Sequence, residues 1–170
     1  MMRLSLLGST GSIGTQALEV VRNLRAQGEE VQVVALAARS SVQALEAQAR
    51  EFRPAMVAVF EEAAARSLRE SLADTGIPVL AGMEGLCQAA AWETATTTLN
   101  AVVGMVGLQP TLAAIRAGKT VALANKETLV AGGAMVVEEA RRHGVKILPV
   151  DSEHSAICLL YTSPSPRDST

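Results

Sequence analysis

One glycine-rich stretch in this chain has residue types and spacing that could bind a phosphate group. The turn Gly8-Ser-Thr-Gly-Ser-Ile-Gly14 follows a short apolar run and precedes a helical pattern. Backbone N–H groups and the positive end of a helix can bind an anion at such a turn. We predict a pyrophosphate there, with Gly8 at positive φ, Gly11 close to the ligand and Gly14 allowing the helix to pack on the strand. The alternative is an unliganded turn, because a three-glycine pattern alone is weak evidence.

A second candidate follows the apolar run Val31 to Ala37. In a dinucleotide-binding fold this position meets the adenosine ribose, where an NAD site places an Asp or Glu. Here that acid is missing, and Arg39 stands beside the hydroxyls of Ser40 and Ser41. A cation with hydroxyls suits a 2′-phosphate, so we predict NADP rather than NAD. Alternatively, Arg39 is a solvated loop residue and Ser41 is the N-cap of the next helix.

A third polar stretch, Asn125-Lys126-Glu127, follows the predicted strand Thr120 to Ala124. It therefore belongs at the carboxyl edge of the sheet, where open α/β sheets bind ligands. For Asn125 alone, an alternative is that it caps a helix over Thr128 to Arg142.

Two carboxylates follow the predicted strand Lys146 to Val150. Residues i and i+2 of an extended chain point the same way, so Asp151 and Glu153 could face one point, with Ser152 between them. Carboxylate oxygens in this arrangement suit a hard cation such as Mg²⁺ or Mn²⁺. The alternative is an acidic loop that caps a following helix.

The remaining chain alternates between apolar runs and amphipathic segments, which predicts an α/β fold with a Rossmann-like, mostly parallel sheet and helices on both faces. The predicted strands are 4–7, 31–37, 56–60, 77–80, 96–103, 120–124 and 146–150. The predicted helices are 15–22, 41–52, 61–72, 85–92, 108–117 and 128–142.

Composition excludes several classes of protein. The 170 residues carry a net charge of -2, so there is no basic surface for nucleic acid. No apolar run is long enough to span a membrane, and no secretory leader opens the chain, so we expect a cytoplasmic protein. The two cysteines, Cys87 and Cys158, are expected to be small buried hydrophobes.

Four stretches, taken together and in order, resemble the 1-deoxy-D-xylulose 5-phosphate reductoisomerase family. They are Leu-Gly-Ser-Thr-Gly-Ser-Ile-Gly at 7–14, Pro-Thr-Leu-Ala-Ala-Ile-Arg-Ala-Gly-Lys at 110–119, Leu-Ala-Asn-Lys-Glu at 123–127 and Leu-Pro-Val-Asp-Ser-Glu-His at 148–154. The resemblance implies an oxidoreductase of the non-mevalonate isoprenoid pathway. Such an enzyme uses NADPH and Mg²⁺, Mn²⁺ or Co²⁺ to convert 1-deoxy-D-xylulose 5-phosphate to 2-C-methyl-D-erythritol 4-phosphate, and its full-length members are expected to be homodimers.

Carried onto this sequence, the resemblance implies a role for each matching residue. Thr10, Gly11, Ser12 and Ile13 would contact the NADPH phosphates, with Asn125 and Glu127 also near the cofactor. Lys126 and Glu153 would be catalytic, Lys126, Ser152 and Glu153 would bind substrate, and Asp151 and Glu153 would bind the metal. The chain departs from the family in one loop, where a glycine followed by Lys or Arg is usual and Arg39-Ser40 stands instead.

The resemblance ends near residue 157. We therefore expect an NADPH-binding domain at 1–150, the start of a truncated catalytic domain at 151–157, and a non-native-looking, disordered or artefactual tail at 158–170. Two functions stay open. The first is an NADPH- and metal-dependent reductoisomerase, and the second is a catalytically inactive NADP-binding fragment.

Overall fold

Strands and helices alternate along the part of the chain that the computed structural model describes, which is residues 1–124 and 126–150, with the backbone alone at 126, 129 and 131. The strands are β1 (Met2–Leu7), β2 (Val31–Ala38), β3 (Met56–Val59), β4 (Val79–Ala81), β5 (Thr97–Asn100), β6 (Thr120–Leu123) and β7 (Ile147–Pro149). The helices are α1 (Ser12–Ala26), α2 (Val42–Phe52), α3 (Glu62–Ser71), α4 (Gly82–Ala90), α5 (Leu108–Arg116) and α6 (Lys126–His143), with a 3₁₀ turn η1 (Met105–Gly107).

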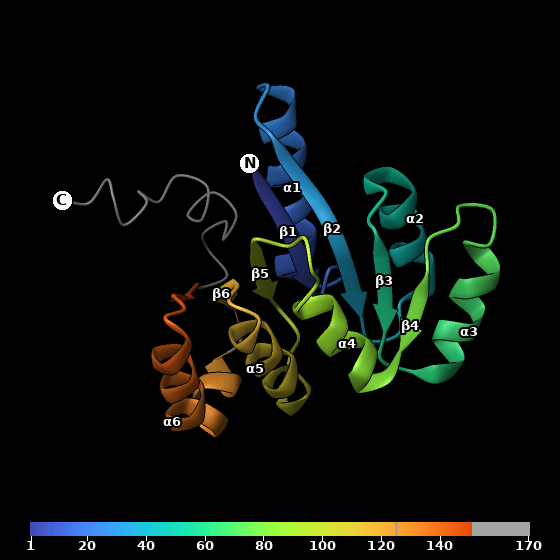
Figure 1. Cartoon of the computed structure of the whole chain (residues 1–170). Coiled ribbons are helices and arrows are strands. Elements are labelled where there is room, and N and C mark those ends of the chain that lie inside the picture. The colour runs from blue at the N-terminus through green and yellow to red at the C-terminus, as the bar shows by residue number, and fades with distance from the viewer. Residues whose placement is uncertain (125, 151–170) are drawn as a thin grey trace.

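The strands form one parallel sheet in the order β4-β3-β2-β1-β5-β6-β7 (Figure 1). Each neighbouring pair is parallel, so every carboxyl end lies at the same edge. Connections between parallel strands must cross over, and the intervening helices supply these crossovers. The predicted α/β fold is confirmed.

The helices divide between the two faces of the sheet. One apolar cluster joins the strands to α1, α2 and α3, through residues such as Leu18, Leu45 and Leu68. The other joins them to α4, α5 and α6, through residues such as Leu86 and Ile115. A sheet covered on both faces needs strands that are apolar throughout. β2 meets this requirement, since only its Gln32 is exposed.

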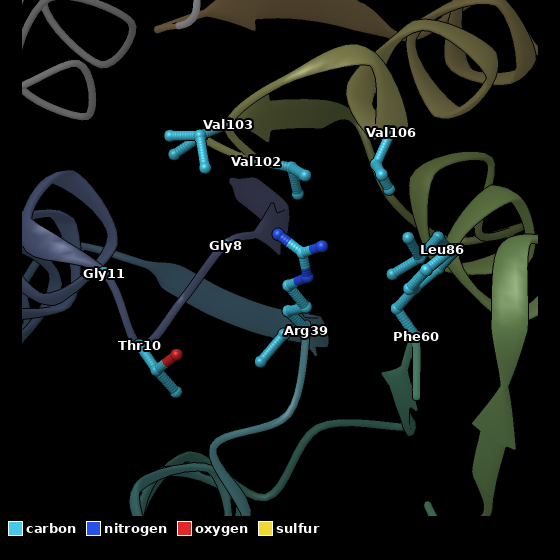
Figure 2. Close-up of a pocket in the computed structure, with 11 residues that line it drawn as sticks. Gly8, Thr10, Gly11, Arg39, Phe60, Leu86, Val102, Val103 and Val106 are labelled. Atoms are coloured by element: carbon cyan, nitrogen blue, oxygen red, sulfur yellow. The ribbon is translucent and has the colours of Figure 1, made fainter. Parts of the chain in front are cut away.

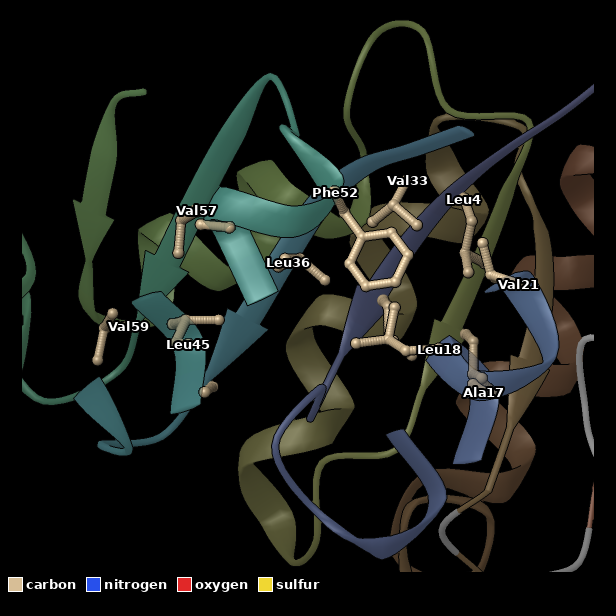
Figure 3. Close-up of a cluster of buried hydrophobic side chains, with 14 of the residues drawn as sticks. Leu4, Ala17, Leu18, Val21, Val33, Leu36, Leu45, Phe52, Val57 and Val59 are labelled. Atoms are coloured by element: carbon tan, nitrogen blue, oxygen red, sulfur yellow. The ribbon is translucent and has the colours of Figure 1, made fainter. Parts of the chain in front are cut away.

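The core is almost entirely aliphatic, as the aromatic content of 2% requires. Phe52, at the end of α2, is an exception: its ring packs with Leu18 of α1 and Val33 of β2 (Figure 3). Arg22 and Arg25 of α1 each hold their guanidinium 5.3 Å from the centre of that ring. Arg22 also makes a bidentate pair with Glu51, at 2.6 and 2.8 Å. Helix α1 is therefore fixed against both α2 and β2.

Several boundaries differ from those predicted. Helix α1 begins at Ser12 rather than at Thr15, and α6 begins at Lys126 rather than at Thr128. The strand predicted over 96–103 ends at Asn100. None of the helices in the described part is long and apolar enough to cross a membrane.

Candidate functional site

The strand order changes direction at β1. β2 pairs with one side of β1 and β5 with the other, while the helices that follow β1 and β5 lie on opposite faces of the sheet. The two connections therefore leave the sheet in opposite directions and open a crevice at the carboxyl ends of these strands. Open α/β sheets bind their ligands in such a crevice.

Gly8 starts the turn at the end of β1. Its φ is +80°, a conformation that L side chains rarely adopt. A Cβ placed on Gly8 would also lie 2.7 Å from the carbonyl carbon and oxygen of Ala101, beyond β5. The N–H groups of Gly8 and Ser9 both donate to the Ala37 oxygen, at 2.8 and 3.0 Å. The turn is thus fixed by both neighbouring strands, and the predicted conformation of Gly8 is confirmed.

Gly14 lies where the first turn of α1 meets the glycine turn. A Cβ there would lie 2.1 Å from the Gly8 oxygen and 2.6 Å from the Ser9 Cα. These nearest atoms belong to the turn that directly follows β1, and the role of Gly14 in packing the helix on the strand itself stays a prediction. The missing side chain allows the first turn of α1 to lie directly on the backbone of the glycine turn.

The N-terminus of α1 carries donors that nothing in residues 1–124 and 126–150 satisfies. Gly11 is the N-cap residue, and no side chain caps the helix. The N–H groups of Thr10, Ser12, Ile13 and Gly14 make no hydrogen bond with the described residues. The first turn contains no Asp or Glu. A helix start with free donors and no internal carboxylate favours an external anion.

A pocket of about 160 Å³ opens beside this turn (Figure 2). It is lined by Gly8, Thr10, Gly11, Ala38, Arg39, Phe60, Leu86, Ala101, Val102, Val103 and Val106. Four of these are predicted site residues: Gly8, Thr10, Gly11 and Arg39. Of the other predicted residues near α1 and β2, Ser12, Ile13, Gly14 and Ser40 do not line it.

Arg39 extends from the end of β2 into the pocket, between the glycine turn and Val106 (Figure 2). Its backbone is held by the Glu61 N–H, which donates to the Arg39 oxygen at 3.0 Å. The guanidinium forms no ion pair with any residue of the described part. A cation that no internal carboxylate neutralises is free to bind an anionic ligand.

The far wall of the pocket is apolar and was missed in the sequence. Phe60 follows β3, Leu86 lies on α4, and Val102, Val103 and Val106 follow β5. These three segments come together only in the folded protein, so spacing along the chain gives no direct signal. The position of Phe60 at the end of the predicted strand 56–60 was the clue available.

Asn100 fixes the loop that carries this wall. Its Oδ1 accepts a hydrogen bond from the Val102 N–H at 3.1 Å, and its Nδ2 donates to the Gly107 oxygen at 2.9 Å and to Thr111 Oγ1 at 2.8 Å. The Asn100 side chain is 1% exposed. By bonding to the backbone, it ends β5 and holds both ends of the loop before α5.

Comparison with known proteins identifies the family. Residues 4–133 match the 1-deoxy-D-xylulose 5-phosphate reductoisomerase family. The chain belongs to this family. A reductoisomerase of Desulfitobacterium hafniense (strain DCB-2) is 54% identical over 157 residues, and one of Agathobacter rectalis is 53% identical over the same length. Each match covers 92% of this chain and 40% of the relative, so the chain spans about two fifths of the length of these reductoisomerases.

Solved structures of reductoisomerases superpose on the chain. A crystal structure in complex with magnesium gives a TM-score of 0.84 at 40% identity and covers 91% of this chain and 38% of the other. The reductoisomerase of Zymomonas mobilis in complex with NADPH gives 0.82 at 41% identity, with coverages of 90% and 39%. Homoserine dehydrogenase from S. aureus, at 14% identity and a TM-score of 0.56, shares the fold alone.

Residues 126 and 127, the described part of the stretch that resembles the reductoisomerase motif, follow β6 at the same edge of the sheet. β6 ends at Leu123, and the Ala124 N–H donates to the Asn100 oxygen at 3.0 Å. Lys126 and Glu127 form the first turn of α6, and Glu127 is exposed. Glu127 does not line the pocket. Asn125 lies outside the described residues.

The predicted metal and substrate residues Asp151, Ser152 and Glu153 also lie outside the described residues. Within residues 1–124 and 126–150, no group of three or more His, Cys, Asp or Glu side chains is placed to hold a metal ion. Cys87 is half-buried on α4, and burial raises the pKa of its thiol. A raised thiol pKa opposes nucleophilic chemistry, although Cys87 is not the fully buried residue that we expected.

Proposed function

We propose that this chain binds NADPH as the cofactor-binding part of a 1-deoxy-D-xylulose 5-phosphate reductoisomerase. The observation that carries the proposal is the arrangement of Arg39 and the glycine turn on one pocket, with unpaired donors on the turn and an unpaired guanidinium opposite. The pyrophosphate would accept hydrogen bonds from the backbone N–H groups of Thr10, Ser12 and Ile13, and would pass close to Gly11. The 2′-phosphate would pair with Arg39, and the apolar wall would exclude water from the bound cofactor.

The residues carried over by resemblance complete the proposal. Lys126 would contact the substrate, while Asp151 and Glu153 would bind a divalent cation, with Ser152 on the substrate. A bound cation would act as a Lewis acid and a template for the oxygens of the keto-sugar phosphate. The part of the reaction assigned to the described residues is to hold and orient the hydride donor. In this view residues 1–150 form the cofactor domain, and catalytic residues follow from 151.

The affinity for NADPH relative to NADH tests the cofactor assignment. We expect this polypeptide to bind NADPH about 100-fold more tightly than NADH, because a charge-assisted phosphate contact contributes roughly 1.5–3 kcal/mol. Arg39→Met should remove most of this preference by weakening NADPH binding alone. Arg66→Met, which changes an exposed arginine on α3 away from the pocket, is the matched control. If Arg39→Met binds NADPH as tightly as the wild type does, the proposed role of Arg39 is refuted.

Turnover of 1-deoxy-D-xylulose 5-phosphate tests the activity separately. With Mg²⁺ or Mn²⁺ present, oxidation of NADPH is followed by its absorbance. Many turnovers per polypeptide would support the reductoisomerase and contradict the inactive fragment. Tight NADPH binding with no turnover would support the fragment.

A further inference from the structure

Gln48 is a buried polar residue on α2 that does not itself line the proposed cofactor pocket. Its side chain is 8% exposed, and its neighbours on the same helix face, Leu45, Ala49 and Phe52, are apolar and buried. The Gln48 Nε2 donates a hydrogen bond to the Ser9 backbone oxygen at 2.9 Å. Helix α2 is thereby joined to the glycine turn by a side chain.

That hydrogen bond determines how one peptide of the turn is oriented. The peptide between Ser9 and Thr10 is trans, because the described chain contains no cis bond. In a planar trans peptide the C=O and N–H groups point in opposite directions. With the Ser9 oxygen held toward α2, the Thr10 N–H must point away from α2. Thr10 lines the pocket, and within the described part its N–H has no acceptor.

The Gln48 amide satisfies one buried acceptor, the Ser9 oxygen, but its placement leaves other buried polar atoms unpaired among the described residues. In residues 1–124 and 126–150, neither Gln48 Oε1 nor Ser9 Oγ, both buried, has a hydrogen-bond partner. A buried polar atom without a partner costs free energy that an apolar side chain of similar shape would not. The glutamine amide therefore has a use that offsets this cost.

We propose that Gln48 is a positioning residue for the cofactor phosphates. By holding the Ser9 oxygen, it keeps the Thr10 N–H directed at the site where a phosphate binds. Without it, the Ser9–Thr10 peptide can rotate and present its oxygen to the anion. The inference rests on the proposed binding of NADPH at this turn.

Gln48→Met and Gln48→Leu test the inference. Both replace the amide, which is the hydrogen-bond donor, with an apolar side chain of similar volume. Gln43→Met, an exposed glutamine on the same helix, is the matched control. Each variant is titrated with NADPH and with adenosine 2′-monophosphate, which retains the adenine and the 2′-phosphate but lacks the pyrophosphate. Urea unfolding is measured alongside.

We expect both Gln48 variants to bind NADPH about tenfold more weakly, the worth of one hydrogen bond. Their affinity for adenosine 2′-monophosphate should stay within about twofold of wild type. Their urea midpoints should fall modestly, because the buried Ser9 oxygen loses its donor. Wild-type affinity for NADPH would overturn the inference. So would an equal loss of affinity for both ligands, since it would mean a purely structural role. Failure of the unmodified chain to bind NADPH would refute the proposed function instead.

Discussion

Replacing Gly14 by alanine gives a direct measure of how tightly α1 is packed on the glycine turn. The new Cβ would lie 2.1 Å from the Gly8 oxygen, 2.6 Å from the Ser9 Cα and 2.8 Å from the Ser9 carbonyl carbon. All three are backbone atoms, so no rotamer change can relieve the contact. Non-bonded carbon atoms prefer separations of about 3.5–4.0 Å. The first turn of α1 must therefore move away from the glycine turn by on the order of 1 Å.

Two effects of opposite sign set the magnitude. Alanine in place of a helical glycine stabilises a protein by about 1 kcal/mol. Overpacking costs about 1–3 kcal/mol, and more where the backbone must shift. Because the Gly14 contacts are with backbone, we expect a net loss of about 2 kcal/mol in the free energy of unfolding. NADPH binding should weaken at least tenfold, since the donors of α1 move with the helix.

Gly133→Ala is the matched control for this substitution. Gly133 also lies in a helix, α6, and nothing described lies within 4 Å of a Cβ placed there. Alanine should therefore stabilise the protein by up to about 1 kcal/mol. Urea unfolding followed by circular dichroism, with fluorescence titration of NADPH, measures both variants. If Gly14→Ala unfolds at the same urea concentration as Gly133→Ala and binds NADPH normally, the close packing described above is refuted.

Three further substitutions test other parts of the structure. Asn100→Ala removes the hydrogen bonds that hold the loop after β5, and we expect urea unfolding to show a loss of about 2 kcal/mol. Arg53→Gly should raise the free energy of unfolding by about 1 kcal/mol, because Arg53 is left-handed at φ 49° and glycine adopts that conformation without cost. Arg22 holds the pKa of Glu51 below its ordinary value, so this pair stabilises the fold above pH 4.5 and is lost as the pH falls. Unfolding of Glu51→Gln should therefore depend less steeply on acid than that of the wild type, and an identical pH profile would contradict the pairing.

The sequence predicted the parts of the site that follow single strands. Gly8 follows β1 and Arg39 follows β2, and both line the pocket as adjacency to those strands implies. The hydrophobic pattern was sufficient here, because placing each residue requires knowing only where its own strand ends. The α/β alternation was predictable for the same reason.

What the sequence did not predict depends on contacts between distant segments. Phe60, Leu86 and Val106 form one wall only because β5 pairs with β1 on the side opposite β2. Asn100 ended a strand that its apolar neighbours would have continued, since its side chain bonds to the backbone of the next loop. The contact of Gly14 with the backbone of Gly8 and Ser9 was not predicted, because it depends on how the turn lies against the helix. These interactions cross the sheet and leave no periodic pattern.

The pairing of β1 has a consequence for the order in which the protein forms during synthesis. Leu4 pairs with Val33 on one side and with Thr97 on the other. One edge of β1 therefore stays unpaired until residues that are translated much later become available. At roughly 5–20 residues per second, that delay lasts on the order of several seconds. During this interval the Gly8 turn lacks its contact with Ala101, while a partly formed sheet exposes the free edge of β1. The nascent chain can complete the pocket beside Gly8 only after β5 has left the ribosome, so capture of the proposed cofactor would be a late event in its folding.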